Sequence, residues 1–145
     1  MKVVVQRVAK ADVTVEGKVV GKIGRGILAL VGFIESDGQK EYQYIKDKLL
    51  NLRIFEDEQG KLNRSVQDID GGILIVPNFT LYADCRQGRR PSFSASSKAD
   101  IAREQFAAFI KLFAEEFPDV ETGEFQADMQ VSLVNDGPVT LIIEI

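Results

Sequence analysis

Apolar residues in the first quarter of the chain follow strand-like patterns. Valine-rich residues 1–9 alternate weakly, and the segments 12–15 and 18–23 flank Glu16-Gly17 in the manner of a hairpin. Residues 26–33 form a continuous apolar run, which predicts a strand buried on both faces. We therefore expect several short strands before the first helix.

The spacing then changes to a helical one. Ser36 and Gln39 have capping-box spacing, and apolar residues recur every three or four positions from Tyr42 to Leu52, which predicts a helix over 38–52. A buried strand is predicted over 73–79, followed by a polar loop over 82–97. A second helix is predicted over 98–117, with a phenylalanine-rich stripe that faces the core and with Pro118 at its end.

Two final strands are predicted near 124–134 and 138–145, joined by a hairpin turn at Asn135-Asp-Gly-Pro. Strands outnumber helices and turns are frequent, so the sequence favours a single α+β domain over residues 1–145. We expect a curved, mostly antiparallel, barrel-like sheet with two main helices, rather than a doubly wound parallel sheet.

Composition limits the chemistry that this chain can perform. The 145 residues are 45% hydrophobic and 28% charged, with a net charge of −4, so only a local basic patch would attract nucleic acid. Without histidine, no Ser-His or Cys-His arrangement can form, and one cysteine does not supply the ligands of a common zinc site. We expect no metal and no cofactor. One cysteine and no long apolar run favour a cytoplasmic protein without membrane contact.

The polar loop after the predicted strand 73–79 is the densest group of candidate functional residues. Arg86, Arg89 and Arg90 lie among hydroxyl and aromatic residues, and guanidinium groups match phosphate geometry. Two interpretations stay open at this point: a patch that binds an anion, or a solvated loop.

Six motifs in register make the chain similar to the D-aminoacyl-tRNA deacylase family over essentially its whole length. They are Val-Val-Gln-Arg-Val at 4–8, Asn-Leu-Arg-Ile-Phe-Glu-Asp at 51–57, Phe-Thr-Leu-Tyr-Ala-Asp at 79–84, Gly-Arg-Arg-Pro-Ser-Phe at 88–93, Val-Glu-Thr-Gly-Glu-Phe at 120–125 and Asn-Asp-Gly-Pro-Val-Thr at 135–140.

The resemblance implies the fold of D-tyrosyl-tRNA deacylase, a homodimer, and hydrolysis of the ester that joins an amino acid to the terminal adenosine of tRNA, as a proofreading step on D-aminoacyl-tRNA and Gly-tRNA. It implies that Gly137-Pro138, with a cis peptide, enters the partner's site and excludes L-amino acids through main-chain carbonyls. Pro77, Gln126 and Met129 are expected to contact the substrate, and Arg86, Arg89 and Arg90 the tRNA.

The chain departs from the family pattern beside Thr80. Pro77-Asn78 stands where the resemblance leads us to expect Ser-Gln, and Gln126 stands where it leads us to expect glycine. Pro77 has no hydroxyl and no backbone N–H. Three interpretations follow: drift at a strand end, a chirality-relaxed paralog that removes L-alanine, or a tRNA-binding relative that has lost catalysis.

The expected mechanism needs no imidazole, because an aminoacyl ester is already activated. The family is thought to use the 2′-hydroxyl of the terminal adenosine to position or activate water. Main-chain N–H groups near Asn78, Phe79 and Thr80 are our candidates for binding the ester carbonyl. The Thr80 hydroxyl is either a chemical participant or a structural group on its strand. Arg7 and Arg53, in contrast to the arginines of the polar loop, are expected to hold the Gly-Pro loop or the fold together rather than to bind tRNA phosphates.

Overall fold

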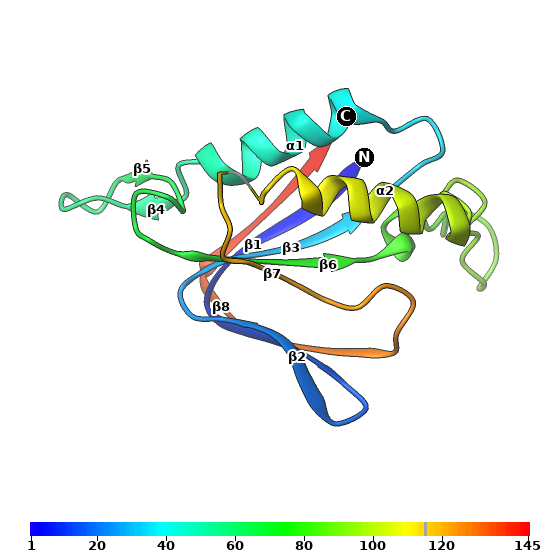
Figure 1. Ribbon diagram of the computed structural model, residues 1–145, viewed down its shortest axis with the longest axis horizontal. Helices are drawn as coiled ribbons and strands as arrows, with labels where there is room; N and C mark the ends of the chain where they lie inside the picture. Colours follow the sequence, from blue (N-terminus) through cyan, green and yellow to red (C-terminus); the bar gives the residue numbers. More distant parts are fainter. Residues whose placement is uncertain (115) are drawn as a thin grey trace.

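A computed structural model describes residues 1–114 and 116–145 as a curved sheet with helices packed on one of its faces (Figure 1). The elements in chain order are β1 (Lys2–Val15), β2 (Lys18–Ile23), β3 (Gly26–Gly32), α1 (Gln39–Asn51), β4 (Phe55–Glu56), β5 (Leu62–Arg64), β6 (Gly72–Pro77), the 3₁₀ helix η1 (Phe79–Tyr82), α2 (Ala99–Lys111), β7 (Val120–Thr122) and β8 (Met129–Glu144). The expected α+β class with a barrel-like sheet is confirmed.

Strand β1 is the centre of the sheet. It pairs antiparallel with β8 along its length, and on its other edge with β3 over residues 2–8 and with β2 over residues 11–15. Strands β3, β6 and β7 are parallel neighbours, so the sheet is mixed. Beyond β7 the sheet curves back to β2, where Gly21 lies so close to the Thr122 carbonyl that a side chain would collide with it. The sheet is therefore nearly closed.

Two hydrophobic cores lie on opposite faces of the sheet, and β1, which contains a bulge, contributes to both. The pairing of β1 with β8 shifts register around Val8, and a bulge of this kind changes which face a side chain occupies. Val3 and Val5 pack under the helices, whereas Val8 and Val13 pack on the concave face of the sheet. Strands β3 and β6 supply both cores through alternate residues, as expected for strands that are buried on both faces.

Helices α1 and α2 cover the same face of the sheet (Figure 1). The capping prediction at Ser36 was wrong: the N-cap is Gly38, whose N–H donates to the Glu41 carboxylate at 2.9 Å. Helix α2 ends at Lys111 rather than near residue 117, and irregular turns carry Phe113 into the core. Residue 115, inside the predicted range 98–117, lies outside the described residues.

The C-terminal region differs most from the prediction. One continuous strand, β8 (Met129–Glu144), replaces the two strands predicted near 124–134 and 138–145, and residues 124–128 form a loop before it. The turn at 135–138 is a break in register within β8 rather than a hairpin. The predicted strands 1–9 and 12–15 are likewise one strand. The short strand β7 was not predicted. The hairpin at Glu16-Gly17 is confirmed, with φ angles of 48° and 77° that suit a type I′ turn.

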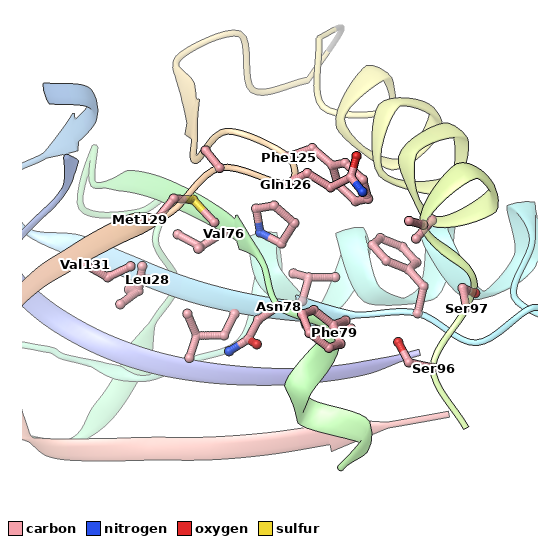
Figure 2. Close-up of a pocket in the computed structure, with 18 of the residues that line it drawn as sticks. Leu28, Val76, Asn78, Phe79, Ser96, Ser97, Phe125, Gln126, Met129 and Val131 are labelled. Atoms are coloured by element: carbon pink, nitrogen blue, oxygen red, sulfur yellow. The ribbon is translucent and has the colours of Figure 1, made fainter. Parts of the chain in front are cut away.

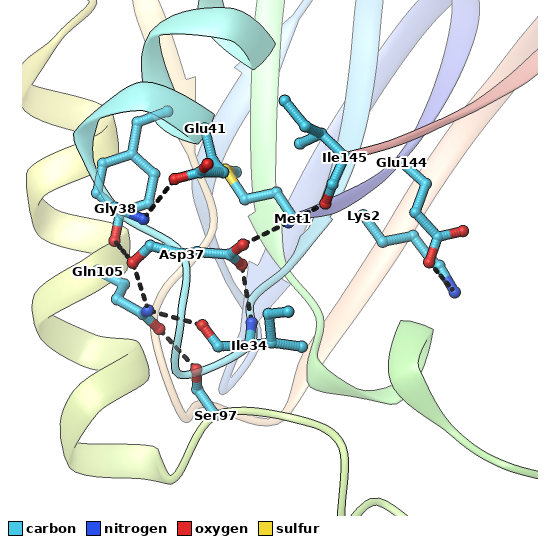
Figure 3. A network of polar contacts seen from close by, with 11 residues as sticks. Met1, Lys2, Ile34, Asp37, Gly38, Glu41, Ser97, Gln105, Glu144 and Ile145 are labelled. Atoms are coloured by element: carbon cyan, nitrogen blue, oxygen red, sulfur yellow. Dashed lines mark hydrogen bonds and ion pairs between the residues drawn. The ribbon is translucent and has the colours of Figure 1, made fainter.

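A buried polar network joins the two helices to the ends of the sheet (Figure 3). The Asp37 carboxylate accepts from the Met1 amine at 2.6 Å and from the Ile34 N–H at 2.8 Å. From α2, the Gln105 amide donates to the Ile34 and Asp37 carbonyls and accepts from the Ser97 hydroxyl at 2.7 Å. The network therefore fixes the segment that leads into α2. No described helix is long and apolar enough to cross a membrane.

Candidate active site

A cavity of about 810 Å³ opens on the concave face of the sheet (Figure 2). Its floor consists of the apolar residues that point to that face from β3, β6 and β8. Its walls are the end of β6, the segment that leads into α2, and the loop between β7 and β8. The lining includes Leu28, Leu30, Val76, Pro77, Asn78, Phe79, Ser96, Ser97, Phe125, Gln126, Met129 and Val131.

The end of β6 brings the backbone of residues 77–79 to the cavity wall. Pro77 is in parallel register with Val31 and is the last residue of β6. The Asn78 N–H then donates to the Val31 carbonyl at 2.7 Å, so the first residue of the site is still tied to the sheet. The chain turns directly into η1.

The side chain of Asn78 caps η1. Its Oδ1 accepts from the Thr80 N–H at 3.1 Å and from the Thr80 hydroxyl at 2.6 Å. Because the amide oxygen is held by Thr80, the amide nitrogen is the group left to donate elsewhere. Thr80 is exposed and does not belong to the residues that line the cavity.

The three backbone donors predicted for the ester carbonyl are therefore not equivalent. The N–H groups of Asn78 and Thr80 already have acceptors, whereas the Phe79 N–H makes no hydrogen bond to any of the described residues. Two donors remain at this wall, the Phe79 N–H and the Asn78 amide nitrogen. Both belong to residues that line the cavity.

The opposite wall is formed by Phe125 and Gln126. Phe125 stacks on Phe106 of α2 with ring centroids 6.1 Å apart, and the guanidinium of Arg103 lies 5.0 Å from the Phe125 ring centroid. Gln126 has a φ of 63°, in the left-handed region that favours glycine, and its amide oxygen accepts from Arg103. Met129 completes this wall, with its sulfur packed close to Gly123.

Gly137 and Pro138 do not reach the cavity of their own chain. They are exposed in the middle of β8, joined by a cis peptide bond. Buried Arg7 holds them in place: its Nε donates to the Asp136 carbonyl at 3.0 Å and its Nη1 to the Ile54 carbonyl at 2.8 Å. The expectation that Arg7 ties down the Gly-Pro loop is confirmed.

The arginines predicted to contact tRNA lie on an exposed loop beside the cavity. Two backbone hydrogen bonds between Asp84 and Ser92, of 2.8 and 2.9 Å, close this loop at its base. Arg86 forms a bidentate pair with Asp84, which lowers the pKa of that carboxyl and raises the pKa of Arg86. Arg89 and Arg90 are exposed.

The structure thus gathers Pro77, Asn78, Phe79, Gln126 and Met129 around one cavity and leaves the other predicted site residues outside it. Sequence reasoning missed Phe125 and the serines at 96 and 97 as lining residues. Phe125 is the last residue of the motif at 120–125 and directly precedes Gln126, which was an available signal. Within the described part of the chain, no cluster of three or more potential metal ligands occurs.

Comparison with known proteins identifies the family of the chain. The family model for D-Tyr-tRNA(Tyr) deacylase matches residues 4–144. Relatives named D-aminoacyl-tRNA deacylase include one from Carboxydothermus hydrogenoformans, 52% identical over all of both chains, and one from Thermosipho africanus, 54% identical over 99% of this chain and 97% of that protein.

Two solved structures have the same fold. One, titled c-Myc DNA Unwinding Element Binding Protein, has a TM-score of 0.93 and 41% identity over 99% of this chain and 98% of that one. The other, titled as a probable eukaryotic D-amino acid tRNA deacylase, has a TM-score of 0.80 and 18% identity over the same shares, and it supports the fold alone. The family match and the full-length relatives together establish that the chain belongs to the D-Tyr-tRNA(Tyr) deacylase family.

Proposed function

We propose that this protein hydrolyses the ester bond of mischarged aminoacyl-tRNA, chiefly D-aminoacyl-tRNA and Gly-tRNA, and releases the amino acid and the tRNA. The observation that carries the proposal is the 52% identity, over the whole of both chains, to a protein named D-aminoacyl-tRNA deacylase. The cavity supports it, because its volume of about 810 Å³ suits a ligand the size of an aminoacyl-adenosine.

In the proposed mechanism the protein supplies position and charge stabilisation. The Phe79 N–H and the Asn78 amide nitrogen bind the ester carbonyl oxygen and stabilise the negative charge that develops as water attacks. The adenosine 2′-hydroxyl, which is part of the substrate, positions that water. Each tenfold gain requires only about 1.4 kcal/mol, so a few oriented donors suffice for an activated ester.

Thr80 acts in this proposal through Asn78. Its hydroxyl proton is held by an amide oxygen, which is too weak a base to generate an alkoxide nucleophile. The same two hydrogen bonds fix the Asn78 side chain in one orientation. Thr80 is therefore proposed as a positioning residue, and Asn78 and Phe79 as the catalytic ones.

We propose that two copies of the chain form a homodimer in which Gly137-Pro138 of one copy completes the site of the other. Strand β8 supports this, because it is sixteen residues long and its outer edge has no partner strand among the described elements. Long exposed edges are normally covered. Three apolar side chains of β8 are exposed as well: Val134, Leu141 and Ile142.

The substrate's tRNA part would bind through Arg86, Arg89 and Arg90, which contact phosphates without reading sequence. The 3′ end of the aminoacyl-tRNA is thus the proposed partner, and the protein is proposed to work in the cytoplasm. The exposed free cysteine Cys85 is compatible with a reducing compartment.

Pro77-Asn78 supports an alternative substrate preference within the same reaction. The shorter amide of Asn78 turns back to cap η1, so it occupies less of the cavity than a longer arm would. Extra room at this wall would admit L-alanine, and loss of the longer amide would also suit a tRNA-binding relative without catalysis. Both alternatives retain the same cavity and the same RNA partner.

The test is deacylation of tRNA charged with D-Tyr, Gly and L-Ala by the purified protein. Hydrolysis of the D-Tyr and Gly substrates, with L-Ala-tRNA spared, is expected. Preference for L-Ala-tRNA would replace the proposal with the chirality-relaxed alternative. Binding of a non-hydrolysable aminoacyl-adenosine without turnover of any substrate would favour the non-catalytic one, and Pro77→Ser with Asn78→Gln should then restore hydrolysis.

A further inference from the structure

Two phenylalanine side chains remain exposed at the mouth of the cavity and pack against each other. Phe79 is 56% exposed and Phe93 is 39% exposed. Their ring centroids lie 5.1 Å apart with the planes at 66°. All other phenylalanines of the chain are buried or half-buried. Adjacent exposed aromatic rings beside a cavity form an apolar patch, and such patches are candidates for binding surfaces.

Both rings are presented by well-fixed backbone. Phe79 is the first residue of η1. Phe93 directly follows the Asp84–Ser92 hydrogen bonds, and its carbonyl accepts from the Ser96 N–H at 3.1 Å. The pair therefore has a defined place relative to the cavity, and a ligand that meets it need not order the loop first.

The position of the pair is one step outside the cavity. Phe79 lines the cavity with Pro77 and Asn78, whereas Phe93 does not. The part of a ligand that fills the cavity would contact Phe79. The next part of the same ligand, outside the cavity, would contact the Phe79–Phe93 pair.

The loop that directly precedes Phe93 is positively charged. Arg86 is paired with Asp84, but Arg89 and Arg90 form no ion pair with any other residue that the structure describes. Aromatic rings beside free guanidinium groups are the combination that binds single-stranded nucleic acid, through stacking of bases and attraction of phosphates.

We propose that Phe79 and Phe93 form a stacking platform for the base of the nucleotide that precedes the terminal adenosine, and that Arg89 and Arg90 bind the adjoining phosphates. This inference rests on the proposed function, in which the terminal aminoacyl-adenosine occupies the cavity. It adds a second subsite, whose ligand is a single-stranded nucleotide of the RNA 3′ end.

A second copy of the chain is the competing occupant of this surface. The charges favour RNA, because two identical basic loops would repel each other whereas phosphates attract them. In the proposed homodimer the second copy enters the cavity itself, through Gly137-Pro138 of β8, whereas Phe93 does not line that cavity.

The first experiment compares two substrates, D-Tyr-tRNA and D-Tyr-adenosine, with the wild type and Phe93→Leu. We expect KM for D-Tyr-tRNA to rise about tenfold with kcat little changed, because stacking contributes binding that is present before the reaction. For D-Tyr-adenosine, which lacks the preceding nucleotide, the rise in KM caused by Phe93→Leu should be much smaller. Phe93→Tyr should restore the wild-type KM.

Tyr44→Leu is the matched control, because Tyr44 is a 40% exposed aromatic residue on α1, away from the cavity. It should leave both substrates unaffected. The inference would be overturned if Phe93→Leu raised KM equally for the two substrates, or if it raised KM for neither. A change in the oligomeric state of Phe93→Leu on size-exclusion chromatography would also overturn it, because it would show that a second copy covers the pair.

A binding experiment separates this inference from the proposed reaction. The probe is an RNA oligonucleotide with the 3′ end CCA in which 2-aminopurine replaces the second cytosine. Stacking of this base on the protein lowers its fluorescence. The fall is expected with wild type and Phe93→Tyr and should be absent with Phe93→Leu. If the wild type hydrolyses neither substrate but still quenches the 2-aminopurine fluorescence, the proposed function is rejected and the stacking platform stands. Hydrolysis without quenching would reject the stacking platform alone.

Discussion

The Nε of Arg7 donates a hydrogen bond to the main-chain carbonyl of Asp136, 3.0 Å away, and links the bulged part of β1 to the turn in β8 that holds Gly137. The same guanidinium also donates to the Ile54 carbonyl beyond α1. One buried side chain therefore joins three separate parts of the chain.

Replacement of this side chain should destabilise the protein. In Arg7→Met, the Asp136 and Ile54 carbonyls lose their donor, and the free energy of unfolding should fall by about 2–3 kcal/mol. Urea denaturation measures the change. Lys10→Met, on an exposed position of the same strand, is the control and should alter stability by less than about 0.5 kcal/mol. A similar effect of both variants would contradict the role given to Arg7.

Asn78 and Thr80 should differ in their effect on activity. Asn78→Ala removes a proposed donor to the ester carbonyl and should lower kcat for D-Tyr-tRNA by about a hundredfold. Thr80→Val removes only the hydroxyl that holds Asn78, and a loss of about tenfold or less is expected. Single-turnover kinetics measures both, and Thr80→Ser should behave as wild type. A greater loss in Thr80→Val than in Asn78→Ala would show that the hydroxyl takes part in the chemistry.

Gln126 combines a left-handed backbone with a long side chain at the cavity rim. Gln126→Gly relieves a conformation that costs other residues about 1 kcal/mol, so stability should be retained despite the lost contact with Arg103. It should also lower KM for D-Tyr-adenosine by about threefold, since the rim becomes less crowded. Gln126→Ala, which keeps the unfavourable conformation, is the comparison. An increase in KM would instead indicate that the Gln126 side chain stabilises the bound substrate rather than crowding it.

The alkaline limit of stability should depend on Tyr82. Burial, with smaller contributions from Asp37 and Glu144, raises the pKa of Tyr82 to about 12 from an ordinary value of 10.0. The folded state therefore favours the neutral phenol, and its contribution is complete below pH 10 and is lost as the pH rises toward 12. Denaturation across this range should show a shallower decline in Tyr82→Phe than in wild type. Identical declines would contradict this assignment.

Local patterns predicted the elements whose spacing is regular. The helix over 38–52 and the strand over 26–33 were found within a residue or two, because their apolar residues recur without interruption. The break of β8 at Gly137-Pro138 has the composition of a hairpin, and only the pairing of both halves with β1 shows that the strand continues. That pairing is a long-range contact, which local composition does not encode.

The apolar pattern predicted a functional loop after a buried strand, whereas the assignment of its individual residues rested on the resemblance to the deacylase family. Pro77, Asn78 and Phe79 were identified there, and they line the cavity. What separates Asn78 from Thr80 is a hydrogen-bond geometry, and spacing along the chain carries no information about it. The role of Phe125 likewise depends on its contact with Phe106 of α2, which joins two separate segments of the chain.

The two hydrogen bonds between Asp84 and Ser92 make the basic loop an exchangeable unit. Residues 85–91 are enclosed by this closure and are all exposed, so their length and sequence can change without disturbing the sheet or either core. A loop transplanted between these two fixed positions would carry its own arrangement of arginines. Under the proposed function, affinity for the tRNA backbone can in this way change independently of the proposed catalytic groups of Asn78 and Phe79.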